Sequence, residues 1–410
     1  MFARIITSSS CKGCLASDCL RGFVMALAFW LVLLHAPTHA TANMHPGFKT
    51  MGLWLPETDE RMDVAVWYPS IRVPSEFRIY EWTLEVARNG KPVPGRFPLI
   101  LLSHGTGGSR FSHHDTAAEL AANGFVVAAI THPGDNIDDT SALFTLRQLV
   151  QRPRQVSQLL DHLLRDPAML EMIDPGRIAA VGFGVGGTTA LMLAGGIPDG
   201  AGWTDYCERA SQGDPYCSPW ARARLDALRD DLKSLKTLPV LRDTRVRAAV
   251  AVAPAYGMLF SRSSMSAVNI PVSIIKAGQD EVNRAPFHAD AIRSALTPSP
   301  EFAILAEADH FSLMAACPPQ LEGILPEVCG GVSPETRERI HMTLNGHLLR
   351  FLVTHLGNTP AFFPVEEPQP APPPTPEVQP AQPETPPAVN ATKGKRAKPR
   401  PKPRANATLP

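Results

Sequence analysis

The sequence has no excess of charge of either sign, because its 410 residues include 39 Lys and Arg against 39 Asp and Glu. This balance excludes a generally basic nucleic-acid-binding protein. The chain also lacks an apolar run long enough to span a membrane near its N-terminus. The run there, Phe23 to Leu34, has 12 residues and is too short to cross a bilayer as a helix. These absences favour a globular protein, and its N- and C-terminal segments differ in composition from the middle of the chain.

The first 42 residues have the features of an export signal. Arg4, Lys12 and Arg21 precede the apolar run, and Ala40 and Ala42 follow it at positions suited to cleavage. No cysteine follows the run, which disfavours a lipoprotein anchor. The alternative is an uncleaved anchor, but the short run favours a cleaved signal peptide over residues 1–42. We therefore expect an exported protein, either periplasmic or secreted.

Cysteine is scarce, and its seven positions fall into two groups. Three cysteines precede the apolar run and would be removed with the signal; they are a weak signal for zinc, and we predict no metal site. Export into an oxidising compartment favours pairing of the other four. We predict two local disulfides, and the alternative is four buried thiols. The predicted pairs are Cys207–Cys217 and Cys317–Cys329.

The last segment, residues 358–410, differs in composition from the rest. It is rich in proline, which opposes helices and sheet ladders, so we expect a disordered tail. Its end, Lys393 to Arg404, is basic and contains no acid. Such an end would be attracted to anionic envelope polymers or lipid headgroups. A solubilising tail without a partner is the alternative.

Residues 43–357 alternate between apolar runs and helical patterns, which predicts one α/β domain with a mostly parallel sheet flanked by helices. Two antiparallel strands are expected between Met51 and Pro69. Residues 197–245 interrupt the alternation and are expected to form a cap-like insertion over the sheet's edge. The predicted sheet strands are Phe97–Ser103, Phe125–Thr131, Ile178–Gly182, Arg247–Ala253, Val272–Ala277 and Phe302–Ala306. The predicted helices are Ala117–Asn123, Arg154–Arg165, Gly186–Ala194 and Arg337–Leu356.

Chemistry-bearing residues follow several predicted strands, where ligands bind in open parallel sheets. A glycine-rich turn over residues 103–108 follows the first strand, and Gly182–Gly187 follows another and opens a helix. Asp280 and His310 each follow a later strand. The spacing of Gly182, Gly184 and Gly187 also fits a dinucleotide fingerprint, but no acid ends the next strand. The Gly182–Gly187 turn, Asp280 and His310 follow one another in the chain order of α/β hydrolases. In those enzymes a strand-to-helix turn, called the elbow, carries a Ser that is activated by a His, and an Asp orients the His.

Several motifs resemble the bacterial dienelactone hydrolase and platelet-activating-factor acetylhydrolase-like branch of the α/β-hydrolases. Residues 103–110 resemble its Ser-His-Gly-x-Gly-Gly-Ser-Arg motif, and residues 131–135 resemble its Asp-His-Pro-Gly motif. Arg152-Pro153 begins a helix motif of the branch, although Gln155 stands where the branch usually has Asp. The strand before Asp280, the loop at His310 and the cysteine spacing are also similar. The resemblance spans about Pro98 to Leu356 and implies the α/β-hydrolase fold.

The sequence departs from this branch at the elbow, which reads Gly182-Phe183-Gly184-Val185-Gly186-Gly187 instead of Gly-His-Ser-Phe-Gly-Gly. The resemblance therefore implies that Asp280 and His310 are a retained acid and base, while Gly184 holds the nucleophile position without a hydroxyl. Thr188 and Thr189 are expected to point away from the site. Backbone N–H groups of Thr106 and Val185 would still form an oxyanion hole.

These residues leave more than one function open. We favour a non-catalytic protein that binds a small ester- or acyl-like ligand without a cofactor. The alternative is a weak carboxylic-ester hydrolase in which Asp280 and His310 activate water directly, because a triad that lacks one member retains some catalysis. A third reading is a degraded copy of an active serine hydrolase.

Overall fold

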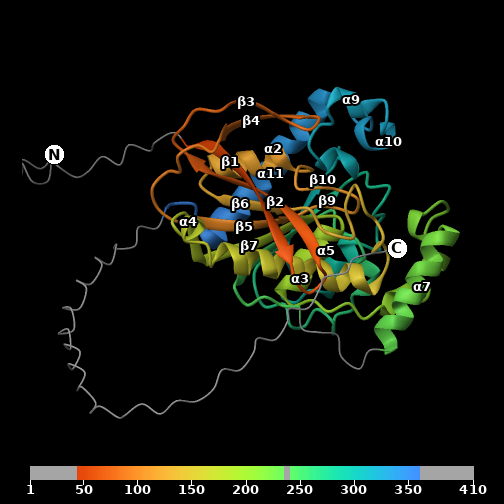
Figure 1. Cartoon of the computed structure of the whole chain (residues 1–410). Helices are drawn as coiled ribbons and strands as arrows, with labels where there is room; N and C mark the ends of the chain where they lie inside the picture. Colours follow the sequence, from red (N-terminus) through yellow and green to blue (C-terminus); the bar gives the residue numbers. More distant parts are fainter. Residues whose placement is uncertain (1–43, 235–240, 361–410) are drawn as a thin grey trace, which may run out of the picture. The chain divides into compact units, whose positions relative to one another are not determined.

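The computed structural model describes residues 44–234 and 241–360 (Figure 1). The predicted signal peptide, the three N-terminal cysteines and the basic tail lie outside these residues. The described strands are β1 (His45–Leu55), β2 (Glu60–Ser70), β3 (Ser75–Ile79), β4 (Trp82–Arg88), β5 (Phe97–Ser103), β6 (Val126–Ile130), β7 (Ile173–Phe183), β8 (Val246–Val252), β9 (Val272–Ala277) and β10 (Glu301–Leu305).

Helices alternate with the strands from β5 onwards. Among the described residues, none of them is long and apolar enough to cross a membrane. The α-helices are α2 (His114–Ala122), α3 (Leu146–Leu163), α4 (Pro167–Leu170), α5 (Val185–Ala194), α6 (Tyr206–Arg209), α7 (Pro219–Ser234), α8 (Ala289–Ala295), α9 (Pro319–Glu322), α10 (Pro326–Cys329) and α11 (Pro334–Leu356). Short 3-10 helices are η1 (Ala201–Trp203), η2 (Pro215–Cys217), η3 (Gly257–Leu259) and η4 (Phe311–Leu313).

The strands form one sheet in the order β10-β9-β8-β7-β5-β6-β2-β1-β4-β3. The six strands from β10 to β6 in this order are parallel to one another. β2 pairs antiparallel with both β6 and β1, which confirms the two antiparallel strands expected before residue 70. The parallel strands all end at one edge of the sheet, so the loops that follow them meet there. This architecture is the predicted α/β-hydrolase fold.

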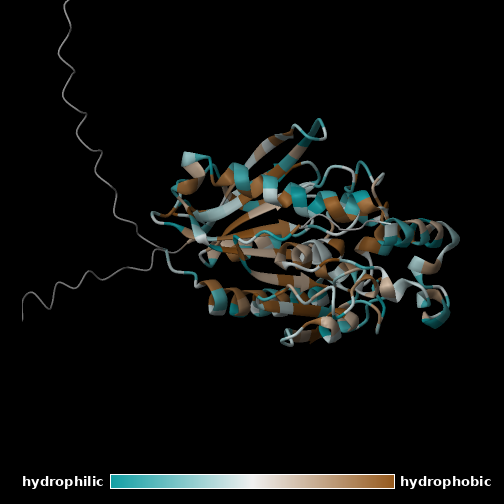
Figure 2. Cartoon of the chain, turned by 90° about the horizontal axis from the view of Figure 1, so that it is seen from below, coloured by the Kyte–Doolittle hydropathy of each residue, from teal (hydrophilic) through white to brown (hydrophobic). Residues whose placement is uncertain are grey.

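The parallel strands are apolar along their whole length because helices cover both faces of the sheet. In β8, Val250 belongs to the core that includes residues of α2 and α11, whereas its neighbour Ala251 packs on the opposite face with residues of α3 and α5. Figure 2 shows the resulting layers, with apolar strands between helices whose outer turns are hydrophilic. The sheet is therefore a rigid base for the loops at its carboxyl edge.

The segment between α5 and β8, which was predicted as an insertion, contains η1, α6, η2 and α7. Its own small core has Trp203 stacked on Tyr206, with ring centroids 5.1 Å apart, and Tyr216 edge-on to Tyr206. The Cys207–Cys217 disulfide closes the loop that carries Tyr216. Figure 1 shows α7 on the side where β7 ends, opposite to α4. The insertion therefore lies next to the carboxyl ends of the strands.

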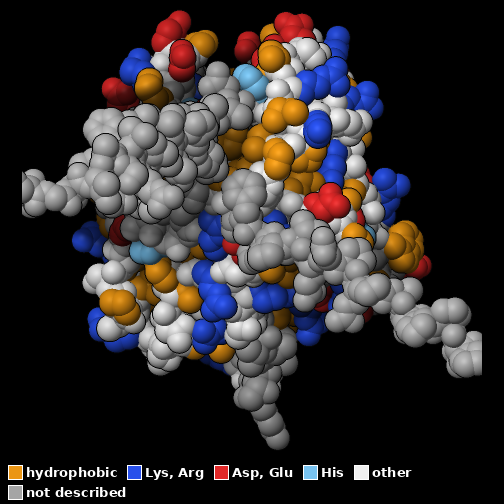
Figure 3. All heavy atoms as spheres, turned by 90° about the vertical axis from the view of Figure 1, so that its left-hand side faces the viewer, with side chains coloured by type: hydrophobic (Ala, Val, Ile, Leu, Met, Phe, Trp, Pro, Cys, Tyr) orange, Lys and Arg blue, Asp and Glu red, His pale blue; other side chains and the backbone are white. Residues whose placement is uncertain are grey.

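Figure 3 views the molecule from the α4 side of Figure 1. Apolar side chains gather in the upper half of the visible part of this face, with Lys and Arg side chains beside them. The strand-end loops discussed below belong to the opposite edge of the sheet, which this view does not show.

The predicted strands and helices correspond to β5–β10, α2, α3, α5 and α11, with two large differences in length. Helix α3 begins at Leu146, two turns before the predicted Arg154, because the Thr145 side chain caps its first turn and the helix continues through Pro153. Strand β7 begins at Ile173 and passes through Pro175 and Gly176 with a register shift against β5. The hairpin β3–β4 was not predicted at all, because its strands are short and half exposed.

Both predicted disulfides are present as cysteine pairs at bonding distance, Cys207–Cys217 and Cys317–Cys329. The second pair encloses α9 and α10, whose helices have four residues each and no buried side chains. Because these helices bury so little apolar surface, the covalent link supplies much of the order of this segment.

Removing the second disulfide should lower the stability of the protein without changing its fold. A cross-link that closes a loop of this size stabilises by about 3 kcal/mol through the entropy of the unfolded chain. We expect the Cys317→Ser/Cys329→Ser variant to lose about that free energy of unfolding in urea titrations under non-reducing conditions. An unchanged midpoint and slope would contradict this role.

Candidate active site

The turn between β7 and α5 carries Gly184, which has φ 56° and ψ −123°. This backbone conformation costs other residues about 1–3 kcal/mol, whereas glycine adopts it readily. The turn is also tightly packed, since a Cβ built on Gly186 would lie 2.0 Å from the carbonyl oxygen of Ser103. Glycine at position 186 therefore allows the first turn of α5 to pack directly against the end of β5.

The structure brings Asp280 and His310 together, as their positions after β9 and β10 suggested. Nδ1 of His310 lies 3.0 Å from Oδ2 of Asp280. The other carboxylate oxygen of Asp280 accepts hydrogen bonds from the backbone N–H groups of Val282 and Asn283, at 3.0 and 2.6 Å. Burial alone would raise the pKa of Asp280, but the hydrogen bond and charge of His310 and the two N–H donors lower it overall. Asp280 is therefore a fixed carboxylate that orients the imidazole ring.

His310 faces Gly184 across a short distance. A Cβ built on Gly184 would lie 3.9 Å from Nε2 of His310 and 3.5 Å from Cα of Gly105. His310 is only 7% exposed, and Nε2 has no hydrogen-bond partner in the described part of the chain. The ring of Phe183 packs beside it, with centroids 4.7 Å apart. Gly184, Asp280 and His310 therefore lie together in one site.

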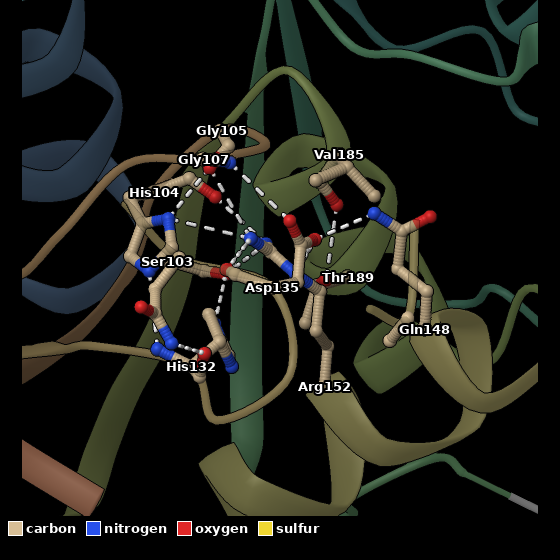
Figure 4. Close-up of polar contacts among 12 residues, drawn as sticks. Ser103, His104, Gly105, Gly107, His132, Asp135, Gln148, Arg152, Val185 and Thr189 are labelled. Carbon is tan, nitrogen blue, oxygen red and sulfur yellow. Dashed lines mark hydrogen bonds and ion pairs between the residues drawn. The ribbon is translucent and has the colours of Figure 1, made fainter. Parts of the chain in front are cut away.

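The loop after β5 is held from below by Arg152 of α3, as Figure 4 shows. The Arg152 guanidinium donates to the carbonyl oxygens of His104 and Gly105, at 2.7 and 3.2 Å. It also pairs with Asp135 at 2.8 Å, and both side chains are almost fully buried. Asp135 in turn accepts from the backbone N–H of Gly107 at 3.3 Å. This buried pair fixes the backbone on both sides of Thr106.

Two buried histidines complete the support of this loop, and their protonation follows from their partners. His104 accepts a hydrogen bond at Nε2 from the backbone N–H of His132, so its proton lies on Nδ1, which donates to Gly105. Burial and the nearby charge of Arg152 lower the pKa of His104 to about 3. Burial and the charge of Arg152 also lower the pKa of His132 well below its ordinary value. Both rings are therefore neutral hydrogen-bonding groups.

Gln155 occupies the position at which the dienelactone hydrolase and acetylhydrolase-like branch usually has Asp. Its side-chain oxygen lies 2.7 Å from Nδ1 of His132, and its amide nitrogen donates to the carbonyl of Pro133 at 3.2 Å. The oxygen is therefore the acceptor, and Nε2 of His132, 2.8 Å from Ser103 Oγ, accepts from that hydroxyl. Since the amide carries no charge, it bonds to a neutral His132 without burying another carboxylate.

A cavity of about 250 Å³ lies over Gly184 and is lined mainly by apolar and aromatic side chains. We expected the insertion and the loop after His132 to supply most of this lining, but each contributes only two residues, and most of the lining follows other strands. Thr188 and Thr189 do not face this cavity, because their hydroxyls donate to the carbonyls of Ala255 and Val185, as expected. The lining residues that matter most here are Thr106, Phe144, Gly184, Val185, Tyr216, Tyr256, Asn283 and His310.

Helix α11 anchors the loop that carries His310, a role that sequence reasoning missed. Arg337 donates to the carbonyls of Phe311 and Met314, at 2.8 and 3.1 Å. His341 contacts the carbonyl of Ser312 through Nε2 at 3.0 Å, and its Nδ1 lies 2.5 Å from Asp115 of α2. The contacts with the histidine loop join residues 23 to 29 positions apart, and the contact with Asp115 spans 226 positions, so no local pattern indicates them. In the described residues, no group of His, Cys, Asp or Glu is arranged to hold a metal ion.

Breaking the Arg152–Asp135 pair on one side only should be strongly destabilising. Arg152→Met leaves Asp135 as an unpaired buried carboxylate, and such a loss costs about 3–5 kcal/mol. The double variant Arg152→Met/Asp135→Asn removes both charges and should recover part of this loss. Urea unfolding of the two variants and the natural protein measures the difference. Equal losses in the single and double variants would show that the charge pair is not what holds the loop.

The Asp115–His341 pair predicts a stability that depends on pH. Burial lowers the pKa of His341, but the bond to Asp115 and its charge outweigh this effect and raise it overall. The same contact outweighs burial at Asp115 and lowers the pKa of that carboxyl. The pair therefore stabilises most between about pH 4 and 6.5, the ordinary values of the two groups. Its contribution falls as pH rises through the raised value of His341, and also in strong acid.

The His341→Gln variant should therefore lose most free energy of unfolding, relative to the natural protein, near pH 5.5, which lies inside the window of about pH 4 to 6.5. Above neutral pH the loss should become progressively smaller. Chemical denaturation of both proteins across a pH series measures the difference. A loss that stays constant over the series would contradict an ionised pair. Met342→Gln, a change at an exposed position of the same helix, is the matched control.

Comparisons with known proteins agree with this architecture. Residues 49–162 match the family described as platelet-activating factor acetylhydrolase, isoform II. A cutinase of Thermobifida alba is 36% identical over 105 residues, which are 25% of this chain and 32% of the cutinase. The chain thus matches only about a third of that relative's length. A ferulic acid esterase from Streptomyces cinnamoneus superposes with a TM-score of 0.50 at 17% identity, over 80% of this chain and 94% of the esterase.

The family match includes the loop after β5, Asp135 and Arg152, but it ends before the elbow, Asp280 and His310. The sequence likeness therefore covers the supporting half of the site, and the solved esterase extends the likeness in fold to most of the domain. The chain has the α/β-hydrolase fold, and over residues 49–162 its sequence is similar to that of esterase-type hydrolases.

Proposed function

We propose that this protein captures a small ester- or acyl-like ligand in the cavity over Gly184 and does not form a covalent acyl intermediate. The observation that carries the proposal is the elbow itself. Gly184 has the elbow's positive φ, and its position faces Nε2 of His310, yet the residue has no side chain that could attack a carbonyl carbon. The relatives and the branch it resembles support an ester-like ligand, since they are acetylhydrolases, a cutinase and an esterase.

The remaining parts of a hydrolase site are compatible with ligand binding alone. Asp280 still orients His310, and the backbone N–H groups of Thr106 and Val185 would still form an oxyanion hole. Main-chain donors of this kind do not depend on the side chain at position 184. The cavity could therefore hold a carbonyl group in the orientation used by hydrolases while lacking the group that cleaves it.

A second function is favoured by the free Nε2 of His310. A water molecule between this nitrogen and the oxyanion hole could be activated directly, which would give a weak carboxylic-ester hydrolase. Catalysis of this kind, without the nucleophile, reaches about 10³–10⁴ over water in triad enzymes. Replacing His310 with Ala would abolish such a rate, and equal rates in both proteins would exclude this mechanism.

We also propose that the protein is exported. Two cysteine pairs at bonding distance favour an oxidising compartment and hence export. Binding of the basic tail to anionic polymers or lipid headgroups rests on the composition of residues 393–404 alone.

Restoring the hydroxyl tests the proposal directly. The Gly184→Ser variant should react with a fluorophosphonate probe and hydrolyse short p-nitrophenyl esters at least about 10²-fold faster than the natural protein, because a complete triad adds orders of magnitude in rate. The positive φ should cost this variant about 1 kcal/mol or more of stability. Gly184→Ala has the same backbone cost without the hydroxyl and is the matched control. Labelling of the natural protein at an ordinary rate would contradict the proposal.

A further inference from the structure

The tyrosine hydroxyls and the asparagine amide that line the cavity have hydrogen-bond partners within the protein. The Tyr216 hydroxyl donates to Oδ1 of Asn283 at 2.6 Å, and the amide of Asn283 donates to the carbonyl of Ala253 at 2.8 Å. The Tyr256 hydroxyl donates to Oε1 of Gln148 at 2.7 Å. The two tyrosine hydroxyls are therefore committed to protein partners, and their rings serve the cavity as apolar surface.

The groups left for a ligand include two backbone N–H donors and one imidazole nitrogen. Nε2 of His310 and the backbone N–H groups of Thr106 and Val185 have no acceptor in the described part of the chain. The lining residues include no Asp, Glu, Lys or Arg. Asp280 lies behind the imidazole and accepts from Nδ1, so Nε2 is the ring nitrogen that faces the ligand. A cavity with two unpaired N–H donors and an imidazole nitrogen suits a carboxylic acid, because one oxygen can accept from the N–H groups while Nε2 takes the acid's proton.

The absence of a side chain at Gly184 leaves room for one more ligand atom beside His310. A Cβ at this position would have only Gly105 and His310 near it, at 3.5 and 3.9 Å, which are ordinary contact distances. In a serine hydrolase this space holds the attacking oxygen. Here a ligand oxygen can occupy it and share a proton with Nε2 of His310.

We propose that the cavity binds a small carboxylic acid as its anion, an inference that rests on the ligand-binding function proposed above. One carboxylate oxygen accepts from the N–H groups of Thr106 and Val185. The other lies over Gly184 beside Nε2 of His310, which takes the acid's proton on binding and then donates to this oxygen. The aliphatic or aromatic remainder packs against Phe144, Tyr216 and Tyr256. An ester or a primary amide offers a carbonyl oxygen for the two N–H donors but no acidic proton that Nε2 could take.

The size of the cavity limits the acid. Its volume of about 250 Å³ lies just below the roughly 300–1,000 Å³ of most small-molecule pockets. Short-chain and single-ring acids therefore fit this space better than long fatty acids. Inorganic phosphate provides the charge without the apolar part and would leave the aromatic lining without contacts.

Isothermal titration calorimetry on the purified protein tests the proposal with butyrate, hexanoate and benzoate as probes. Hexanamide, methyl hexanoate and inorganic phosphate are the comparison ligands, at constant pH and ionic strength. We expect at least one acid to bind about tenfold or more tightly than its amide, since only the acid forms a charge-assisted hydrogen bond with the imidazole. Amide or ester binding as tight as acid binding would overturn the carboxylate assignment while leaving ligand binding intact.

Variants at the site separate the carboxylate assignment from general binding. Gly184→Ala fills the space over the elbow, and His310→Gln removes the cationic donor, so each should weaken the acid about tenfold and the ester much less. His355→Gln on α11 is the control and should leave both affinities unchanged. If Gly184→Ala does not fold, Asp280→Asn leaves the elbow intact and should weaken the acid by removing the charge behind His310.

Three outcomes overturn the inference. Acid affinity unchanged in both His310→Gln and Asp280→Asn would place the acid elsewhere on the protein. Phosphate binding as tightly as hexanoate would show a general anion site. No binding of any acid, amide or ester would remove both the carboxylate assignment and the ligand-binding function.

Discussion

The contact between the first turn of α5 and the end of β5 determines the arrangement of the site. A Cβ at Gly186 would overlap the carbonyl oxygen of Ser103, so the helix can approach the strand only through glycine. This approach places Gly184 next to Gly105 and brings Val185 and Thr106 to the same cavity. The buried Arg152–Asp135 pair then fixes the loop from the other side. Without both constraints, the donors proposed for the ligand would have no defined geometry.

The chemistry of the site depends on how His310 is oriented by the residues around it. Asp280 orients His310, and helix α11 holds the backbone of the histidine loop through Arg337 and His341. All of these supports are present although Gly184 lacks a hydroxyl. A scaffold that keeps a buried, carboxylate-backed histidine in place must offset the cost of burying those groups. Retention of the pair is easier to explain if it still contacts a ligand than if it has no partner.

Much of this arrangement could be predicted from sequence because it follows from strand order. Asp280 and His310 follow parallel strands, and parallel strands end at one edge, so their proximity needed no structural information. The start of α3 was misplaced because Pro153 indicated a helix boundary, whereas the Thr145 cap starts the helix earlier. Arg152 and His341 could not be assigned roles, because their partners lie far away in the chain and depend on how helices pack on the sheet.

The central claim is that ligands enter this hydrolase-like site and leave it without becoming attached to the protein. Intact-protein mass spectrometry during incubation with an activated acyl ester, quenched at a series of times, tests it most directly. The account predicts one unmodified mass throughout the reaction. A transient species heavier by one acyl group, mapped to any residue of the cavity, would contradict it.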